Sequence, residues 1–127
     1  MSTRSITFLN NKNIDFKVKK YKHKERGAVY ASQAIEFPLE RTIKTLVVDM
    51  GSKGFVMVLM PGDKKLDLTR LAKKISVKKA AMADTSTAQR LTGYMIGGIN
   101  PFGTKKKLPV VLEKSILNYD EIAINAG

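Results

Sequence analysis

Cysteine is absent from this chain of 127 residues. Without a thiol, the chain can form neither a disulfide bond nor a cysteine-based zinc site, and a cysteine nucleophile is excluded. Histidine occurs once, at His23. A metal site built from several imidazoles is therefore impossible, and a Ser/His/Asp triad could use only this histidine. Because lysine flanks His23 on both sides, we interpret it as a surface residue in preference to a catalytic base.

Acidic residues are also few, with 11 Asp and Glu against 23 Lys and Arg and a formal net charge of +12. Such an excess favours polyanionic partners, of which nucleic acid is the main candidate. The basic residues do not collect on one long amphipathic helix, as binding to a membrane surface would require. The N-terminus lacks a signal-peptide core, and no run approaches the roughly 20 apolar residues of a membrane span. We therefore expect a cytoplasmic protein without membrane association.

The chain has the length of one domain, residues 1–127, and 43% of its residues are hydrophobic. Apolar spacing predicts four short helices, namely from a cap at Ser2 or Thr3 through Leu9, over 31–35, over 66–74, and from a cap at Thr85 or Ser86 to Gly93. Alternating or β-rich runs predict strands over 16–21, 42–50, 54–60 and 108–112 and from residue 122. Gly51 to Gly54 predict a hairpin between the second and third strands. We expect a single α/β domain with a mixed sheet and surrounding helices.

Residues 93–103 form an apolar and aromatic stretch that four glycines interrupt, and a lysine triplet follows directly. Glycines allow backbone amides to come close to a ligand, and Pro101 stiffens the loop that carries them. The lysines indicate that such a ligand is negatively charged. The alternative is a glycine-rich hairpin that only turns the chain. The stretch matches neither GxGxxG nor a P-loop, so nucleotide-dependent chemistry has no support.

Lys44 interrupts an otherwise apolar β-run. A lysine at such a position either extends to solvent, which is the simpler interpretation, or faces a polar cleft. In the second case its ammonium could bind a carbonyl, a carboxylate or a phosphate, with Thr45 on the opposite pleat. Three aspartates, Asp63, Asp67 and Asp84, could be acids or metal ligands, but capping of predicted helix starts explains them.

Several other lysines form separate doublets at 64–65, 73–74 and 78–79 and the triplet at 105–107. If the fold brings them to one side, they form a surface that follows a phosphate backbone. If it does not, they are ordinary solvated faces. The net charge favours the first interpretation.

Four motifs occur together in this order: Ile43 to Val47, Met60 to Leu68, Met82 to Asp84 with Ala88 to Arg90, and Thr92 to Gly103. Together they resemble the YbaK/EbsC proteins, which include free-standing aminoacyl-tRNA deacylases and the editing domain inserted in bacterial prolyl-tRNA synthetases. The resemblance runs from about Tyr21 to Gly127. It implies a YbaK-like fold and hydrolysis of the ester that links a mischarged amino acid to the 3′ end of tRNA, of the Cys- or Ala-tRNA(Pro) type.

The resemblance also implies roles for individual residues. Lys44 lines the active-site pocket and is the expected catalytic residue. The expected substrate-binding residues are Tyr21, Thr45, Gly97, Gly98, Ile99, Pro101, Gly103 and Asn125, and the expected tRNA-binding residues are Lys105, Lys106 and Lys107. No metal or cofactor is implied, and the expected partners are tRNA and an aminoacyl-tRNA synthetase.

In this family no side chain is assigned as nucleophile, and a water or the thiol of a cysteinyl substrate attacks. A chain without cysteine and with one histidine would likewise have to catalyse by positioning and charge stabilisation. A non-catalytic module that binds tRNA or a synthetase is the alternative function. A third class is a regulator that binds a small molecule in the glycine loop. The basic surface argues against this class, because binding a small molecule does not need it.

The chain departs from the family at two places. Asn125-Ala126-Gly127 stands where many relatives read Ser-Gly-Gly, and Asn100 stands where they have serine. In relatives a further strand follows, with an aspartate near the pocket, so we expect the C-terminal end of the domain to be short here.

Overall fold

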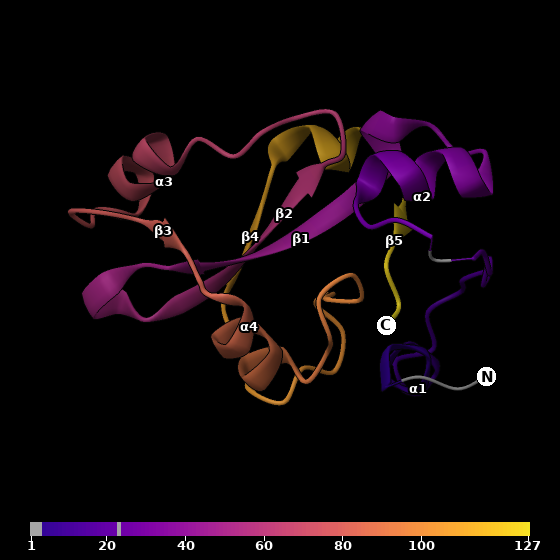
Figure 1. The fold of residues 1–127 in the computed structure, drawn as a ribbon, viewed down its shortest axis with the longest axis horizontal. Helices are drawn as coiled ribbons and strands as arrows, with labels where there is room; N and C mark the ends of the chain where they lie inside the picture. Colours follow the sequence, from indigo (N-terminus) through magenta and orange to yellow (C-terminus); the bar gives the residue numbers. More distant parts are fainter. Residues whose placement is uncertain (1–3, 23) are drawn as a thin grey trace.

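The computed structural model describes residues 4–22 and 24–127, and a mixed sheet of five strands lies at its centre (Figure 1). Strands β1 (Thr42–Asp49) and β2 (Phe55–Pro61) are antiparallel and form the predicted hairpin. Strand β4 (Val110–Leu112) pairs in parallel with β2. On the other edge of β1 lie the antiparallel strand β3 (Ala81–Met82) and the parallel strand β5 (Ala123–Ile124). The predicted α/β class with a mixed sheet is confirmed.

Four α-helices and three short 3-10 helices surround the sheet within the described residues. They are α1 (Arg4–Asn11), α2 (Ala28–Ile35), α3 (Leu68–Ile75), α4 (Thr85–Thr92), η1 (Leu39–Arg41), η2 (Gly51–Lys53) and η3 (Lys114–Asn118). In Figure 1, α3 and α4 lie on opposite sides of the long β1–β2 ribbon. All four predicted helices are present, although α2 begins three residues earlier than expected. No helix among the described residues is both long and apolar enough to cross a bilayer.

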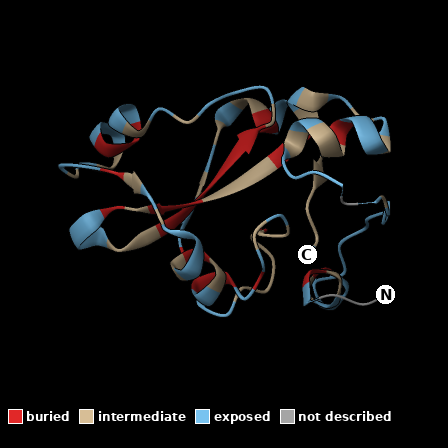
Figure 2. Cartoon of the chain, in the orientation of Figure 1, coloured by how far each residue is buried: buried red, intermediate tan, exposed pale blue. Residues whose placement is uncertain are grey.

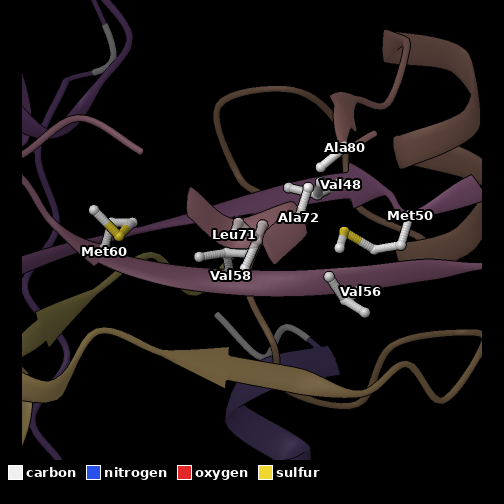
Figure 3. Packing of buried hydrophobic residues seen from close by; sticks show 8 residues of the cluster. All are labelled: Val48, Met50, Val56, Val58, Met60, Leu71, Ala72 and Ala80. Atoms are coloured by element: carbon white, nitrogen blue, oxygen red, sulfur yellow. The ribbon is translucent and has the colours of Figure 1, made fainter. Parts of the chain in front are cut away.

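Each face of the β1–β2 hairpin carries its own apolar cluster, because side chains alternate along a strand. On one face the hairpin packs against α3 and the segment that follows it (Figure 3), through Val48, Met50, Val56, Val58, Met60, Leu71, Ala72 and Ala80. On the other face it packs against α4 through Val47, Met57, Ala88, Leu91 and Leu108. The architecture therefore has three layers, with the sheet in the middle.

Aspartates cap α3 and α4. The Asp67 carboxylate accepts a hydrogen bond from the Arg70 amide (3.0 Å), and Asp84 does the same for the Thr87 amide (2.8 Å). Hydrogen bonds from Thr87 and then Ser86 hold the pKa of Asp84 below its ordinary value. The expectation that Thr85 or Ser86 caps α4 was therefore wrong, because the carboxylate one residue earlier takes the role. Asp63 caps no helix and lies in the turn after β2.

Replacing Asp67 by alanine is expected to lower the free energy of unfolding by about 1 kcal/mol, because the Arg70 amide loses its acceptor. Thermal or urea unfolding measures the change. Asp63→Ala is the control, since Asp63 is exposed and makes no cap, and it should change the free energy by less than about 0.5 kcal/mol. Equal losses in the two variants would contradict the capping role.

The predicted strand over residues 16–21 was wrong. Residues 13–22 form no helix or strand, and Figure 2 shows the segment between α1 and α2 as exposed. Phe16 and Val18 are 37% and 51% exposed. Their alternation with lysine suits a strand only where a sheet edge is available for pairing. That edge of β1 is instead occupied by β5, which agrees with the strand predicted from residue 122, and by β3, which the sequence analysis did not predict.

Candidate functional site

The glycine-rich loop borders a hollow of about 380 Å³. Three separate parts of the chain line it: Arg26 before α2, residues 96–98 of the loop, and Gly127. Gly97 has φ +95°, a value that L side chains rarely adopt. A Cβ atom on Gly98 would lie 3.1 Å from the Cα and carbonyl carbon of Gly127. The missing side chain at Gly98 thus lets the backbone of Gly127 approach the loop closely.

Hydrogen bonds from side chains fix the conformation of this loop. The Gln89 side chain of α4 accepts from the Ile96 amide (2.9 Å). Asn100, which is fully buried, accepts from the Phe102 amide and donates to the Gly98 carbonyl, each at 3.0 Å. The loop joins α4 to β4, a helix to a strand, so the alternative of a hairpin between two strands was wrong.

Two neighbouring amides of the loop remain available as donors. The N–H of Gly98 is used, since it donates to the Met95 carbonyl at 2.9 Å. The N–H groups of Gly97 and Ile99 make no hydrogen bond with any of residues 4–22 and 24–127. Free backbone N–H groups beside a hollow are suited to binding an anion or a developing oxyanion.

Asn125 connects the sheet to the loop. In the register of β1 and β5, Ile43 is opposite Ile124, and Asn125 is the next residue. Its side-chain amide donates to the Gly97 carbonyl, while its oxygen accepts from the Gly127 amide at 3.2 Å. The structure therefore brings the predicted site residues Asn125, Gly97 and Gly98 together at the hollow.

Lys44 and Thr45 lie at a gap in the sheet. Strands β3 and β5 pair with the same edge of β1, and residues 44–46 fall between them. Thr45 points to the face that carries α4, and its hydroxyl is buried without a hydrogen-bond partner among the described residues. A buried hydroxyl without a partner is uncommon, and a ligand could supply one.

The ammonium of Lys44 is on the opposite face, as the alternation of a strand requires. It donates to the Lys64 carbonyl at 2.5 Å. The Lys44 ammonium has three N–H donors, and the Lys64 carbonyl accepts from one of them, so two remain for a ligand. No hydrogen bond or ion pair joins Lys44 to the glycine loop within the described parts of the chain.

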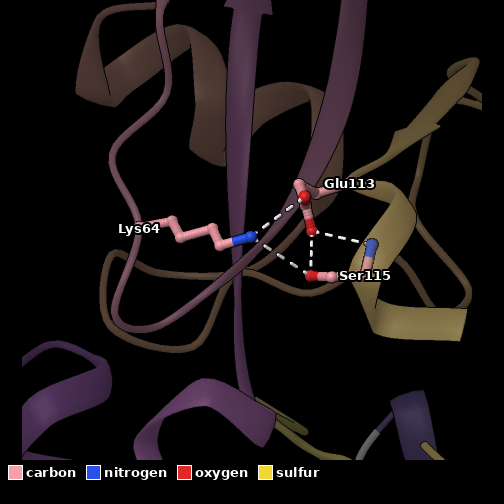
Figure 4. Close-up of polar contacts among 3 residues, drawn as sticks. All are labelled: Lys64, Glu113 and Ser115. Carbon is pink, nitrogen blue, oxygen red and sulfur yellow. Dashed lines mark hydrogen bonds and ion pairs between the residues drawn. The ribbon is translucent and has the colours of Figure 1, made fainter. Parts of the chain in front are cut away.

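An ion pair joins Lys64, in the turn after β2, to Glu113, which directly precedes η3 (Figure 4). The Lys64 ammonium is 3.3 Å from a Glu113 oxygen, and the second oxygen of that carboxylate accepts from the Ser115 amide (3.0 Å) and hydroxyl. The hydrogen bond from the Ser115 hydroxyl is the main cause that lowers the pKa of Glu113. Glu113 therefore remains ionised and fixes the residue whose carbonyl binds Lys44, which is a structural role.

Tyr21 packs beside α2, with its ring 6.1 Å from that of Tyr30. Partial burial, and secondarily Tyr30, raises the pKa of Tyr21, so the phenol is neutral at physiological pH. It does not line the hollow. Arg26 does line the hollow, and the sequence analysis did not predict it as a site residue. A Cβ atom on Gly97 would lie 3.5 Å from Cγ of Arg26, so the stem of this arginine packs on the loop. His23, expected at the surface, falls outside the described residues.

The lysine triplet is exposed and lies next to the end of α4. The Lys105 and Lys106 amides donate to the carbonyls of Thr92 (3.1 Å) and Leu91 (2.9 Å). A Cβ atom on Gly93 would touch both Arg4 and Lys105, so these two cations are neighbours. The doublet at 73–74 belongs to α3 on the other side of the sheet. The basic residues therefore do not all share one face.

Of the remaining predicted substrate-binding positions, Pro101 and Gly103 are half-buried within the loop and do not line the hollow. Gly103 has φ +59° and packs against α1, where a Cβ atom would lie 3.1 Å from Cγ of Arg4. Among the described residues, no group of three or more His, Asp and Glu side chains could hold a metal ion.

The family model for the aminoacyl-tRNA editing domain matches residues 24–127. EbsC of Enterococcus faecalis, named as a Cys-tRNA(Pro)/Cys-tRNA(Cys) deacylase, is 38% identical over 87 residues, which cover 68% of this chain and 53% of that protein. The multifunctional Ser/Thr-tRNA deacylase ProXp-y of Escherichia coli K12 is 32% identical over 129 residues, which cover 98% of this chain and 76% of that protein.

A solved structure described as a trans-editing enzyme for prolyl tRNA synthetase superposes with a TM-score of 0.83 at 29% identity, covering 94% of this chain and 75% of that one. The sheet and the helices around it are thus those of an aminoacyl-tRNA editing domain. The chain belongs to the YbaK/EbsC family, whose named members here are tRNA deacylases and therefore hydrolyse the aminoacyl-tRNA ester bond.

Proposed function

We propose that this chain hydrolyses the ester of mischarged aminoacyl-tRNA in trans, and that its substrates are of the Cys- or Ala-tRNA(Pro) type. The observation that carries the proposal is the hollow at the glycine loop, where the backbone is accessible and two amides are free. The name of EbsC supports the cysteinyl substrate, and the trans-editing structure supports prolyl-tRNA synthetase as a partner. A cytoplasmic location fits these partners.

Hydrolysis of such an ester needs charge stabilisation above all. Water attacks the carbonyl carbon and gives up a proton, and the carbonyl oxygen gains negative charge. If the thiol of a cysteinyl substrate attacks in its place, cysteine leaves as a thiolactone, which water then opens. We assign the free N–H groups of Gly97 and Ile99 to the carbonyl oxygen. The Lys44 ammonium makes no contact with the loop, and its role as the positive charge of the site rests on the family resemblance. The bond to the ribose oxygen then breaks, and this oxygen takes up a proton as it leaves. No step requires a cysteine, a second histidine or a metal.

Binding of the 3′ end falls to the residues around the hollow. Arg26 has a guanidinium that is suited to phosphate, and its stem is fixed against Gly97. The unpartnered hydroxyl of Thr45 and the side chain of Asn125 are polar groups for the amino acid or the terminal ribose. Tyr21 does not line the hollow and enters the proposal only through the family resemblance, as a neutral hydrogen-bond donor.

A panel of aminoacylated tRNAs tests the function. We expect the purified chain to hydrolyse Cys-tRNA(Pro) or Ala-tRNA(Pro) faster than Pro-tRNA(Pro), with release of the amino acid measured over time against buffer alone. The same panel should include seryl and threonyl esters, because ProXp-y is named for them. If no ester is hydrolysed above the buffer rate although tRNA binds, the chain is a tRNA-binding module of this fold and the proposal fails.

Replacing Lys105, Lys106 and Lys107 together by alanine is expected to flatten the dependence of tRNA affinity on salt. If all three neutralise phosphates, the slope of log affinity against log salt should fall by roughly two to three units. Fluorescence anisotropy with labelled tRNA at several salt concentrations measures the slope. Hydrolysis of an aminoacyl-adenosine, which lacks the tRNA body, should change little.

The matched control removes three lysines from the other side of the sheet, at Lys73, Lys74 and Lys79. It causes the same change in net charge but should leave the slope within about one unit of wild type. If both triple variants alter the slope equally, net charge alone accounts for binding, and the triplet is not a specific phosphate site.

A further inference from the structure

Helix α1 lies outside the range that the editing-domain model matches, which begins at residue 24, yet it packs on the glycine loop. Ser5 in its first turn is completely buried. The Ser5 hydroxyl donates to Oδ1 of Asn100 at 2.9 Å and lies 2.8 Å from the Tyr94 hydroxyl. A serine near the start of a short helix is thus hydrogen-bonded to residues 89 and 95 positions away.

The two partners of Ser5 control the shape of the loop. The same Oδ1 of Asn100 accepts from the Phe102 amide, and its Nδ2 donates to the Gly98 carbonyl. The Tyr94 hydroxyl lies 2.5 Å from the Phe102 carbonyl as well as 2.8 Å from the Ser5 oxygen. Because the Ser5 proton goes to Asn100, the single proton of Tyr94 is shared between the Phe102 and Ser5 oxygens. Ser5 therefore completes a network that reaches both ends of the segment between Gly98 and Phe102.

Apolar contacts reinforce the same junction. The rings of Phe8 and Phe102 are stacked, with centroids 6.1 Å apart. A Cβ atom on Gly103 would lie 3.1 Å from Arg4 and 3.3 Å from Phe8, so the glycine allows α1 to approach the loop closely. The contact between α1 and the loop is thus both apolar and hydrogen-bonded.

A buried polar network imposes one geometry on the groups that form it. Burying a hydroxyl, an amide and a phenol costs free energy unless each is hydrogen-bonded, and the observed arrangement of the loop satisfies all three. Without the Ser5 hydroxyl, Asn100 and Tyr94 would each lose a buried partner. The loop could then adopt conformations in which Gly97, Gly98 and Ile99 are displaced.

We propose that Ser5 is a positioning residue for the editing reaction. It acts through Asn100 and Tyr94 to hold the glycine loop, and it makes α1 part of the functional unit although α1 lies outside the matched range. The inference rests on the proposed function, since it concerns the same hollow. It adds a residue that does not line the hollow and would not be sought there.

The kinetic test compares Ser5→Ala with Ser32→Ala. Ser32 is also a buried helical serine, 9% exposed, and donates to the Phe37 carbonyl at 2.5 Å, away from the loop. Because a shift of about 1 Å in a site can cost on the order of 10²-fold, we expect Ser5→Ala to lower kcat by roughly 10- to 100-fold with little change in KM. Ser32→Ala should keep the wild-type kcat. Tyr94→Phe should act in the same direction as Ser5→Ala, and their effects should not add.

Hydrogen exchange provides a readout that does not depend on activity. In Ser5→Ala the Phe102 amide should exchange about tenfold faster, as expected for one weakened hydrogen bond, while Ser32→Ala should leave it unchanged. Normal kcat in a folded Ser5→Ala protein overturns the inference, and so does unchanged exchange at Phe102. If the wild type hydrolyses no ester, the proposed function fails, whereas faster exchange would still support positioning of the loop by Ser5. If Ser5→Ala does not fold, Tyr94→Phe decides by the same two measurements.

Discussion

Lys44→Ala is expected to lower kcat/KM for ester hydrolysis by on the order of 10²-fold or more, the usual consequence of removing one donor to the transition state. The fold should survive, because the half-buried Lys44 makes one hydrogen bond, to the exposed residue Lys64. Single-turnover hydrolysis of the best substrate from the tRNA panel measures the loss. Thermal unfolding confirms that the variant is folded.

The control for this prediction is Lys53→Ala at the far end of the hairpin. Its ammonium also binds a backbone carbonyl, that of Ile75, at 2.6 Å. Both variants therefore lose one lysine and one bond of the same kind, and Lys53→Ala should hydrolyse the ester at the wild-type rate. A folded Lys44→Ala protein that retains the wild-type rate would show that the ammonium takes no part in the reaction.

Gly98→Val is expected to reduce kcat/KM by about 10²-fold, because the side chain would enter the hollow. Even its Cβ atom would lie 3.1 Å from the Gly127 backbone, and the two methyl groups would occupy space that the substrate needs. The kinetic constants should be measured with both aminoacyl-tRNA and an aminoacyl-adenosine. Both substrates should be affected alike, since we propose that both place their terminal nucleoside in the hollow.

The control for Gly98→Val is Gly51→Ala, which should reduce stability without affecting the hollow. Gly51 lies in the β1–β2 connection. Gly51 has φ +63° with nothing within 4 Å of a Cβ, so alanine there fits but costs about 1 kcal/mol of backbone strain. Its turnover at a temperature where both variants are folded should equal that of wild type. Equal kinetic damage from the two substitutions would mean that the glycine loop has no special role in binding.

Local patterns were enough to predict the central hairpin and the capped helix α3. The runs at 42–50 and 54–60 are rich in β-branched residues with glycines between them, and Asp67 precedes an amphipathic stretch. The strand predicted over 16–21 failed because alternation describes one segment and says nothing about a free sheet edge. Pairing of β5 with β1 joins residues about 80 positions apart, which no local pattern reveals.

The candidate site was predicted only in part for the same reason. The glycines of the loop have a local signal, and so does a lysine within an apolar strand. Arg26 belongs to a run of charged residues, and its contact with Gly97 depends on the tertiary fold. Ser5 looks like an ordinary helical serine, because nothing near it in sequence indicates burial against Asn100.

Parallel strand β5 pairs with β1 at two residues only, yet its next residues carry Asn125 and Gly127 to the hollow. Contacts of such long sequence separation form late in folding, because closing a long loop costs entropy before the contact repays it. A complete site depends on a pairing that is among the shortest between the described strands, so the weakest part of the sheet is also the part that the hollow needs.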